Sequence, residues 1–520
     1  TTVPAHSFYL LERSDDDTIS DIVADQVYSG SGFSQNMMKN NGIEILELKN
    51  QNSQLIDITP SGNSWVAGKD SPSYKTMERV NPYRDGANPD NWATNDGITI
   101  NGLNADGGKV HGTPKAQNSQ YDPTLAISTI ISAKTIIASS TIWSLGRSPY
   151  ILESSGRLYP TLKAGATLII ESGVIIKPSS MLIIEGTLLA QGTPEKPILF
   201  TSNQPTPQPG DWASIIFKPE SVGSVLENVI FEYGGREFVP FNQRVDYSMV
   251  DIEQSPVTIK NCQFKKGGWI ALKLNNSSTL VENSVFAENT KGIVIDGADS
   301  HPIIRDSEFR GADHRGTGIE ISGGAAPVIS SNDFSNLYYP VLLKNASPVF
   351  SGNLVSNNNY NGVFVHWQTI FTQNLVWQNN LTYILMSNAN EYPTASGTVL
   401  TIEPGTIIKS ANKYYTALKV LRGRLVAEGT ESEPIIFTSF KDDSIGGDTN
   451  NDGSATAPAT DGDWKDVVFS AGSSGSLSNI HFKYGGYIPG GPPGYDLYKT
   501  LSIDPAAEAD VILGDNVMVN

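Results

Sequence analysis

The chain has 520 residues, with 36 Lys and Arg against 54 Asp and Glu, which gives a formal net charge of −18. A surface this acidic repels nucleic-acid phosphates and anionic lipid, so we expect neither as a partner. The length allows about three domains. No apolar run reaches the roughly 20 residues of a membrane helix, and the single cysteine, Cys262, excludes an internal disulfide and a cysteine-built metal site.

The chain changes character along its length. Residues 1–118 carry alternating strand-like runs, such as 43–48, separated by clusters of Gly, Asn and Pro. Residues 119–163 are rich in Ser, Thr and Ile, which indicates a linker and a segment that covers the first coil of the next domain. From residue 164 a short pattern repeats to the end, and helical periodicity is weak throughout. We therefore predict an all-β protein.

The repeating pattern is an apolar residue, an Asn or Asp two places on, and a second apolar residue five places after the first. The last members recur every 21 to 25 residues and are Phe264, Phe286, Phe309, Phe334, Val355 and Val376. This period predicts a right-handed parallel β-helix, whose strands pair with their counterparts one coil away at about 4.8 Å. The apolar members would stack inside, and the polar member would occupy a turn, where Asn tolerates a left-handed backbone.

A longer repeat divides the β-helix into two modules, 164–397 and 398–520. The phrase Pro-Ile-Leu-Phe-Thr-Ser at 197–202 returns nearly unchanged at 434–439, and Gly-Asp-Trp follows in both copies. These phrases resemble those of secreted bacterial β-helix surface proteins. The resemblance implies a fold and leaves the function open.

A candidate calcium loop lies in extra residues of the second copy. Its proposed ligands are Asp448, Asn450, Asp452, Asp461 and Asp463. The first three stand at positions 1, 3 and 5, with Gly at position 6, as at the start of a calcium-binding loop. Position 12 is Ala rather than Glu, so one of the last two Asp residues would complete the shell. A solvated Asn/Asp/Gly loop is the alternative.

Seven phrases follow one another in the N-terminal region, at 4–11, 41–48, 55–57, 65–68, 77–79, 91–94 and 112–118. Through them, residues 1–118 resemble the lamin-tail domain, which implies an immunoglobulin-like β-sandwich. The opening strands of that family are absent, so part of the sandwich would lie upstream or come from another chain. We expect core positions for Trp65 and Trp92, and a structural ion pair for Arg79.

Two polar turns, 299–301 and 313–315, contain Asp, His and Arg one coil apart and are the best catalytic candidates. Their composition is that of exposed loops, so we predict no catalytic residue. Metal-binding His spacings and nucleophile or phosphate-loop motifs are absent from the sequence. Cys262 is expected to be a small structural residue within one coil of the β-helix rather than a nucleophile.

Three tryptophans, Trp269, Trp367 and Trp377, would form a sugar-stacking patch if they point outward. Trp377 follows an expected inward anchor, Val376, and so is expected to face outward.

The last coil, at 513–518, is followed by no cap, and a solenoid end without a cap exposes strand edges. Either the chain is an excerpt, or copies associate head to tail through residues 1–12 and 500–520.

These observations favour a non-enzymatic, extracellular structural or adhesive protein of the bacterial cell surface, which would assemble into a filament, sheath or surface layer. The alternative is a polysaccharide-active or carbohydrate-binding β-helix protein whose partner is a surface polysaccharide. An outward face lined by carboxylates together with Lys or Arg would favour that alternative.

Overall fold

The computed structural model describes residues 8–13, 16–28, 45–49, 55–62, 64–82, 84–122, 128–238, 245–367, 369–386, 392–411, 414–459, 462–486, 500–507 and 510–519. The chain divides into two compact units, one of residues 1–129 with 144–149 and one of residues 130–143 with 150–520.

The described strands of the N-terminal unit form three separate pairs. The pairs are β1 (Leu11–Arg13) with β2 (Gln26–Tyr28), which is parallel, and β3 (Glu47–Lys49) with β4 (Leu55–Ile58) and β5 (Met77–Arg79) with β6 (Trp92–Thr94), which are antiparallel. Short 3-10 helices lie at η1 (Pro89–Asn91) and η2 (Leu145–Arg147). An immunoglobulin-like sandwich is not confirmed, and the lamin-tail resemblance stays a prediction.

A buried carboxylate organises the N-terminal unit. Glu78 is 4% exposed and accepts hydrogen bonds from Asn95, Thr113 and Ser119 at 2.6–2.8 Å. Because a buried charge is tolerated only when hydrogen bonds compensate its desolvation, this network pins three segments around β5.

The aromatic residues of the N-terminal unit lie nearer the surface than expected. Trp65 and Trp92 are both half-buried rather than core residues. Arg79 makes the structural ion pair predicted for it, with Asp57, and its guanidinium lies 5.4 Å from the Trp92 ring centroid.

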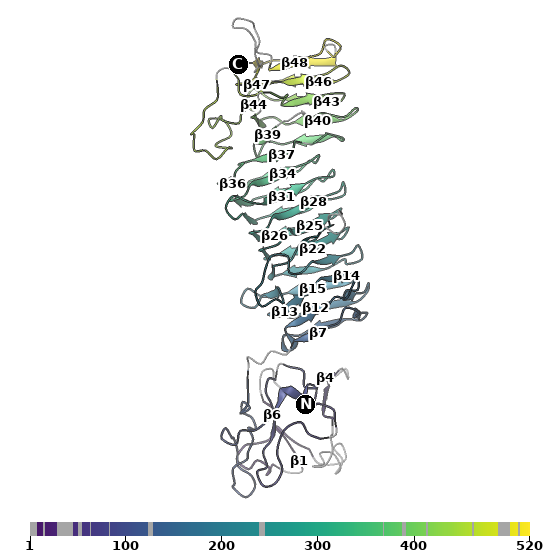
Figure 1. Ribbon diagram of the computed structural model, residues 1–520, viewed down its shortest axis with the longest axis vertical. Helices are drawn as coiled ribbons and strands as arrows, with labels where there is room; N and C mark the ends of the chain where they lie inside the picture. Colours follow the sequence, from purple (N-terminus) through teal and green to yellow (C-terminus); the bar gives the residue numbers. More distant parts are fainter. Residues whose placement is uncertain are drawn as a thin grey trace. The chain divides into compact units, whose positions relative to one another are not determined.

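The second unit is a right-handed parallel β-helix whose coils stack strand upon strand (Figure 1). Its fifteen-stranded sheet, here called the long sheet, consists of β8 (Ile136–Ile137), β11 (Thr161–Leu162), β14 (Met181–Ile184), β17 (Ser214–Phe217), β22 (Ser248–Glu253), β25 (Ile270–Asn275), β28 (Lys291–Asp296), β31 (Thr317–Ile321), β34 (Tyr339–Leu343), β37 (Val363–Val365), β39 (Tyr383–Leu385), β41 (Ile407–Ser410), β44 (Ile435–Ser439), β47 (Ile480–Phe482) and β50 (Val517–Val519).

Two further sheets complete the first coils. The ten-stranded sheet consists of β7 (Thr129–Ile131), β10 (Tyr150–Leu152), β13 (Ile175–Pro178), β16 (Ile198–Phe200), β19 (Val229–Glu232), β24 (Gln263–Lys265), β27 (Val285–Ala287), β30 (Glu308–Arg310), β33 (Asp333–Ser335) and β36 (Leu354–Ser356). The nine-stranded sheet consists of β9 (Thr141–Trp143), β12 (Thr167–Ile170), β15 (Thr187–Gln191), β18 (Val225–Glu227), β23 (Thr258–Lys260), β26 (Leu280–Glu282), β29 (Ile303–Arg305), β32 (Val328–Ser330) and β35 (Val349–Ser351).

Smaller sheets complete the later coils. They are the five strands β38 (Leu375–Trp377), β40 (Val399–Ile402), β43 (Arg424–Glu428), β46 (Ser474–Ser478) and β49 (Val511–Leu513), and the three strands β42 (Leu418–Val420), β45 (Val467–Phe469) and β48 (Leu501–Ile503). A short hairpin, β20 (Glu237–Phe238) with β21 (Val245–Asp246), leaves the coil before β22.

The interior is a set of stacked apolar columns, as the repeat predicts. Phe200, Phe231, Phe264, Phe286, Phe309 and Phe334 stack face to face, with successive ring centroids 4.7–5.0 Å apart. This spacing matches the separation of paired strands, so identical side chains meet from coil to coil.

The polar member of the repeat occupies a left-handed turn, as predicted, with φ of 53° at Asn261, 49° at Asn283 and 51° at Asp306. The residue after each turn forms a buried polar column that the sequence did not indicate. Backbone N–H groups donate to the side chain one coil on, from Cys262 to Ser284, Ser284 to Ser307, Ser307 to Asn332 and Asn332 to Asn353, at 3.0–3.2 Å. This column satisfies backbone groups that the tight turn leaves unpaired.

The predicted boundaries shift in two places. Within residues 119–163, where the sequence predicts a linker and a covering segment, strands β7 to β11 already join the sheets of the β-helix, so the coils begin before residue 164. The apolar ladder ends at Val355, because Phe371 and Val376 pair with Thr394 and β40 instead of continuing the columns of β35 and β36.

The two copies of the longer repeat occupy different faces of the β-helix. Matching Ile-Ile-Lys phrases lie in β13 and β41, yet β13 belongs to the ten-stranded sheet and β41 to the long sheet. As a result Lys177 is half-buried, whereas its counterpart Lys409 is completely buried.

Replacing Phe309 by Ala removes a fully buried ring from the middle of its column. We expect a loss of about 3–5 kcal/mol in the free energy of unfolding, measured by urea denaturation. The control Ile303→Ala lies in the same coil but is 43% exposed, and should cost less than about 1 kcal/mol. Equal losses in the two variants would contradict the stacked core.

Candidate functional site

The long sheet presents one outward-facing side chain per coil at its centre. In pairing register these are Asp251, Lys273, Val294, Glu320, Leu342, Phe364, Ile384 and Lys409. Their strand neighbours, such as Val250 and Ile252, are fully buried in the core, so alternation along each strand turns this column outward. The strands from β22 to β39, which carry all of this column except Lys409, are stacked in Figure 1.

Asp251 is the most strongly perturbed carboxyl group of this column. Its side chain is 14% exposed, and its Oδ1 atom is inaccessible to solvent and accepts no hydrogen bond. Burial raises the pKa of Asp251 to about 6, with Lys273 at 3.9 Å opposing that shift. Asp251 is therefore a much weaker acid than an ordinary Asp side chain.

Glu253 lies two residues further on the same face of β22. Its carboxylate is 2.6 Å from the ammonium group of Lys218, and its side chain is 36% exposed. The negative charge of Glu253 contributes to the raised pKa of Asp251. Alternate residues of one strand thus present two carboxyl groups with different environments, separated by about 6–7 Å at their Cα atoms.

Glu320 lies three coils from Asp251 and is held between two lysines. Its carboxylate is 2.7 Å from Lys291 and 2.7 Å from Lys344. Burial would raise the pKa of Glu320, but the hydrogen bonds and charges of the two lysines outweigh it and hold that pKa below its usual value. Glu320 therefore stays ionised and positions both ammonium groups.

An aromatic platform, defined as Tyr338, Tyr339, Tyr360, Phe364 and Trp367, continues the outer face. Neighbouring rings have centroids 4.5–6.5 Å apart. Tyr338 is 39% and Trp367 36% exposed. The other members pack over the outer apolar residues Leu342 and Ile384.

His366 contacts the aromatic platform and is also affected by the charges of Lys344, Glu320 and Lys291. Its ring stacks on Trp367 at 4.4 Å between centroids, and burial, aided by the charge of Lys344, lowers the pKa of His366. The imidazole is therefore neutral at pH 7.

The 440–459 insertion folds against this same face. The backbone N–H of Asn361 donates to the carbonyl of Thr449 and its side-chain amide to that of Asp448, both at 2.9 Å. The ring of Phe440 lies 5.7 Å from Tyr360.

The insertion brings together part of the predicted metal set. The carboxyl oxygens of Asp448, Asp452 and Asp443 lie within 4.8 Å of one another. Asn450 donates to Asp452 at 2.8 Å. Asp463 lies elsewhere, accepting from Ser439 and Lys441, and Asp461 lies outside the described residues. The sequence missed Asp443 because only the folded insertion brings it to the loop.

The structure does not assemble the turns 299–301 and 313–315. The first follows β28 at one end of the long-sheet strands, and the second precedes β31 at the opposite end. The two turns therefore lie at opposite ends of the long sheet's strands, although they belong to neighbouring coils.

The tryptophan prediction is wrong for Trp377, which is fully buried and stacks on Tyr383. Trp269 is half-buried under Lys291, whose Nζ atom lies 5.4 Å from its ring centroid, and Trp367 is exposed. Trp269 and Trp367 lie four coils apart, so they make no common patch. Cys262 is a buried coil residue as predicted, and burial raises its pKa to about 12.

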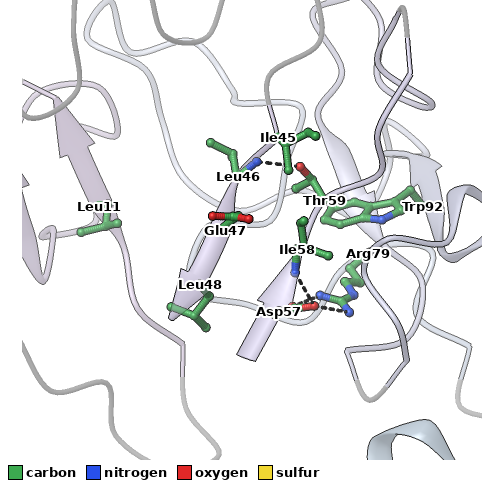
Figure 2. A pocket seen from close by; sticks show the side chains of 10 residues that line it. All are labelled: Leu11, Ile45, Leu46, Glu47, Leu48, Asp57, Ile58, Thr59, Arg79 and Trp92. Atoms are coloured by element: carbon green, nitrogen blue, oxygen red, sulfur yellow. Dashed lines mark hydrogen bonds and ion pairs between the residues drawn. The ribbon is translucent and has the colours of Figure 1, made fainter. Parts of the chain in front are cut away.

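The N-terminal unit has a cavity of about 490 Å³, shown in Figure 2. Arg79, paired with Asp57, and Trp92 form one side, and Leu48 with other residues of β3 and β4 forms another. The segments next to β3 in the sequence, 29–44 and 50–54, lie outside the described residues, so we assign no function to this cavity.

Two family models match the β-helical unit. The model of the right-handed beta helix region matches residues 249–399, and that of the pectate-lyase like beta helix domain matches residues 147–224 and 369–487. Together with the parallel sheets, they establish the right-handed parallel β-helix. No curated protein matches the chain.

Solved structures give distant matches. One is a mutant DFA-IIIase from Arthrobacter chlorophenolicus, with 11% identity, coverage of 72% of this chain and 84% of that chain, and a TM-score of 0.24. Another is the catalytic domain of a GH87 alpha-1,3-glucanase in complex with nigerose, with 10% identity, coverage of 86% and 84%, and a TM-score of 0.24. These values are too low to carry a functional argument.

The expectation that the chain is not an enzyme is overturned by the pectate-lyase-like match, which points to a carbohydrate-active class. That expectation rested on the absence of a known catalytic motif from the sequence. In a β-helix, however, the outward side chains of one strand and of its stacked neighbours can form a site without a recognised sequence motif.

No helix among the described residues is long and apolar enough to cross a bilayer. Association of copies through residues 1–12 and 500–520 stays a prediction, and residues 1–7 lie outside the described part of the chain.

The pKa of Asp251 gives a prediction for stability. Because that pKa is raised from 3.8 to about 6, the wild type loses stability as pH rises through this window. Asp251→Asn cannot ionise, so between pH 4 and pH 8 its unfolding free energy should rise relative to wild type by about 1–3 kcal/mol. Urea midpoints at both pH values measure this. The exposed control Asp299→Asn should track wild type, and an equal trend in Asp251→Asn would contradict a buried acid.

Proposed function

We propose that the chain is a polysaccharide-active enzyme that hydrolyses a glycan lying along the outer face of the long sheet. The observation that carries the proposal is the pair of carboxyl groups on β22. Burial raises the pKa of Asp251 to about 6, whereas Glu253 forms an ion pair with Lys218 at 2.6 Å. The pectate-lyase-like family match supports the same class.

In this proposal the two carboxyl groups divide the chemistry of glycoside hydrolysis. Asp251 donates its proton to the departing glycosidic oxygen, since a carboxylic acid with a raised pKa is a general acid at mildly acid pH. Glu253 supplies the second carboxyl group that glycosidases require, as a base for water or as a nucleophile at the anomeric carbon.

The remainder of the outer face supports binding of an extended chain. Four lysines, Lys218, Lys273, Lys291 and Lys344, offset the carboxylates of this face in a protein of net charge −18, so an acidic polysaccharide would not be repelled. Phe364 on β37 lies five coil steps from Asp251, about 24 Å along the axis, which is room for several sugar units.

Two further expectations from the sequence remain proposals, one on the fold of residues 1–118 and one on the cellular location. The ordered phrases of residues 1–118 support a lamin-tail-like domain, and the resemblance of the coils to secreted bacterial proteins supports work at or outside the cell surface.

Hydrolysis can be tested with a panel of acidic and neutral polysaccharides, following new reducing ends. We expect the rate to fall about tenfold per pH unit above 6, as Asp251 ionises. Asp251→Asn and Glu253→Gln should each lose at least about 100-fold in kcat, while Asp299→Asn keeps full activity.

Two results would contradict the assignment. One is an unchanged rate in Asp251→Asn, and the other is absorbance from an unsaturated product, which would show elimination instead of hydrolysis.

Substrate binding by the platform has a separate test. Trp367→Ala should raise KM about fivefold with kcat unchanged, because one exposed ring contributes about 1 kcal/mol of stacking. Tyr414→Ala, which removes a 59% exposed ring outside the platform, should leave KM unchanged. A loss confined to kcat would exclude a stacking role.

A further inference from the structure

We propose that the insertion between β44 and β45 binds one divalent cation of the calcium class, through the carboxylates of Asp443, Asp448 and Asp452. Three carboxyl groups, one oxygen of each within 4.8 Å of the others, repel one another, and a cation between them would relieve the part of this repulsion that the backbone N–H groups donating to Asp448 and Asp452 do not. Calcium takes 6–8 oxygen ligands in flexible geometry, which three carboxylates and loop oxygens can supply. The site is independent of the hydrolytic proposal.

A second observation points to a missing ligand. Both carboxyl oxygens of Asp443 are inaccessible to solvent and accept no hydrogen bond. The side-chain oxygen of Asn450 is equally inaccessible and unpartnered, while its amide group donates to Asp452. Buried acceptors without a donor are costly, and a cation would satisfy those of Asp443 and Asn450 together.

The buried lysine beside the loop does not take the place of that cation. Lys409 donates to the backbone carbonyls of Asp442 at 2.8 Å and Gly447 at 2.6 Å. Its positive charge also acts on the carboxylates of Asp443 and Asp448. Its ammonium group holds the backbone of the loop, and its single positive charge offsets only part of the charge of the three carboxylates, which leaves a net negative charge for another cation.

The position of the site gives the cation a structural task. Asp448 also accepts from the side chain of Asn361 through its carbonyl, and Asn361 follows Tyr360 of the platform. A cation in the loop would therefore hold the insertion against the outer face of the long sheet.

The test uses the full chain after dialysis against EDTA, titrated with calcium chloride. We expect one calcium ion per chain by calorimetry, and a Tm rise of roughly 3 °C at a calcium concentration of 100 times the Kd. The informative variant is Asp443→Asn, because Asp443 makes no hydrogen bond that the loop needs. In EDTA its Tm should equal or exceed that of wild type, and calcium should no longer raise it.

The control Asp299→Asn removes an exposed charge from another coil and should keep the full calcium response. The proposal is overturned if wild type binds no calcium, or if Asp443→Asn keeps the same stoichiometry and Tm shift. A variant that is less stable in EDTA would also overturn it, since that result assigns Asp443 a structural role without a cation.

Discussion

The structure depends on one contact, the stacking of each strand on its counterpart one coil away. The phenylalanine column from Phe200 to Phe334 repeats at 4.7–5.0 Å because paired strands impose that distance. The left-handed turns and the buried column from Cys262 to Asn353 satisfy the backbone where strands end. Each coil therefore templates the next, and the core needs no helix or disulfide.

Because the interior columns alone form the core, the outward side chains of the long sheet are not needed for packing and can take part in binding or catalysis. Asp251, Lys273 and Glu320 contribute nothing to the interior columns, yet strand register aligns them on one face. Partial burial on that face raises the pKa of Asp251, while two lysines keep Glu320 ionised. Two carboxyl groups of similar intrinsic acidity thus acquire pKa values shifted in opposite directions from position alone.

The position of a side chain on one face of the β-helix also explains the environment of Lys409 beneath the insertion. A rotation of the second repeat by one face places Lys409 on the long sheet, where the insertion covers it, whereas the matching Lys177 stays half-buried. Repeated sequence therefore does not imply a repeated environment. The charge of Lys409 is compensated by backbone carbonyl groups and nearby carboxylates of the insertion, which ties the loop to the coil beneath it.

The sequence by itself determined the period, the inward apolar residues and the left-handed polar turns, because these depend on neighbours at a constant interval. It also indicated Asp448 and Asp452, which share one loop. Only the tertiary structure decided that Trp377 points inward, that Asp443 joins the loop, and that the outer face combines Asp251 with the lysines. The insertion that holds Asp443 has no counterpart in the first repeat, and Trp377 lies beyond the end of the apolar ladder. Asp251 and Lys273 are one coil apart, but only the winding of the chain decides that this column of the strand faces outward.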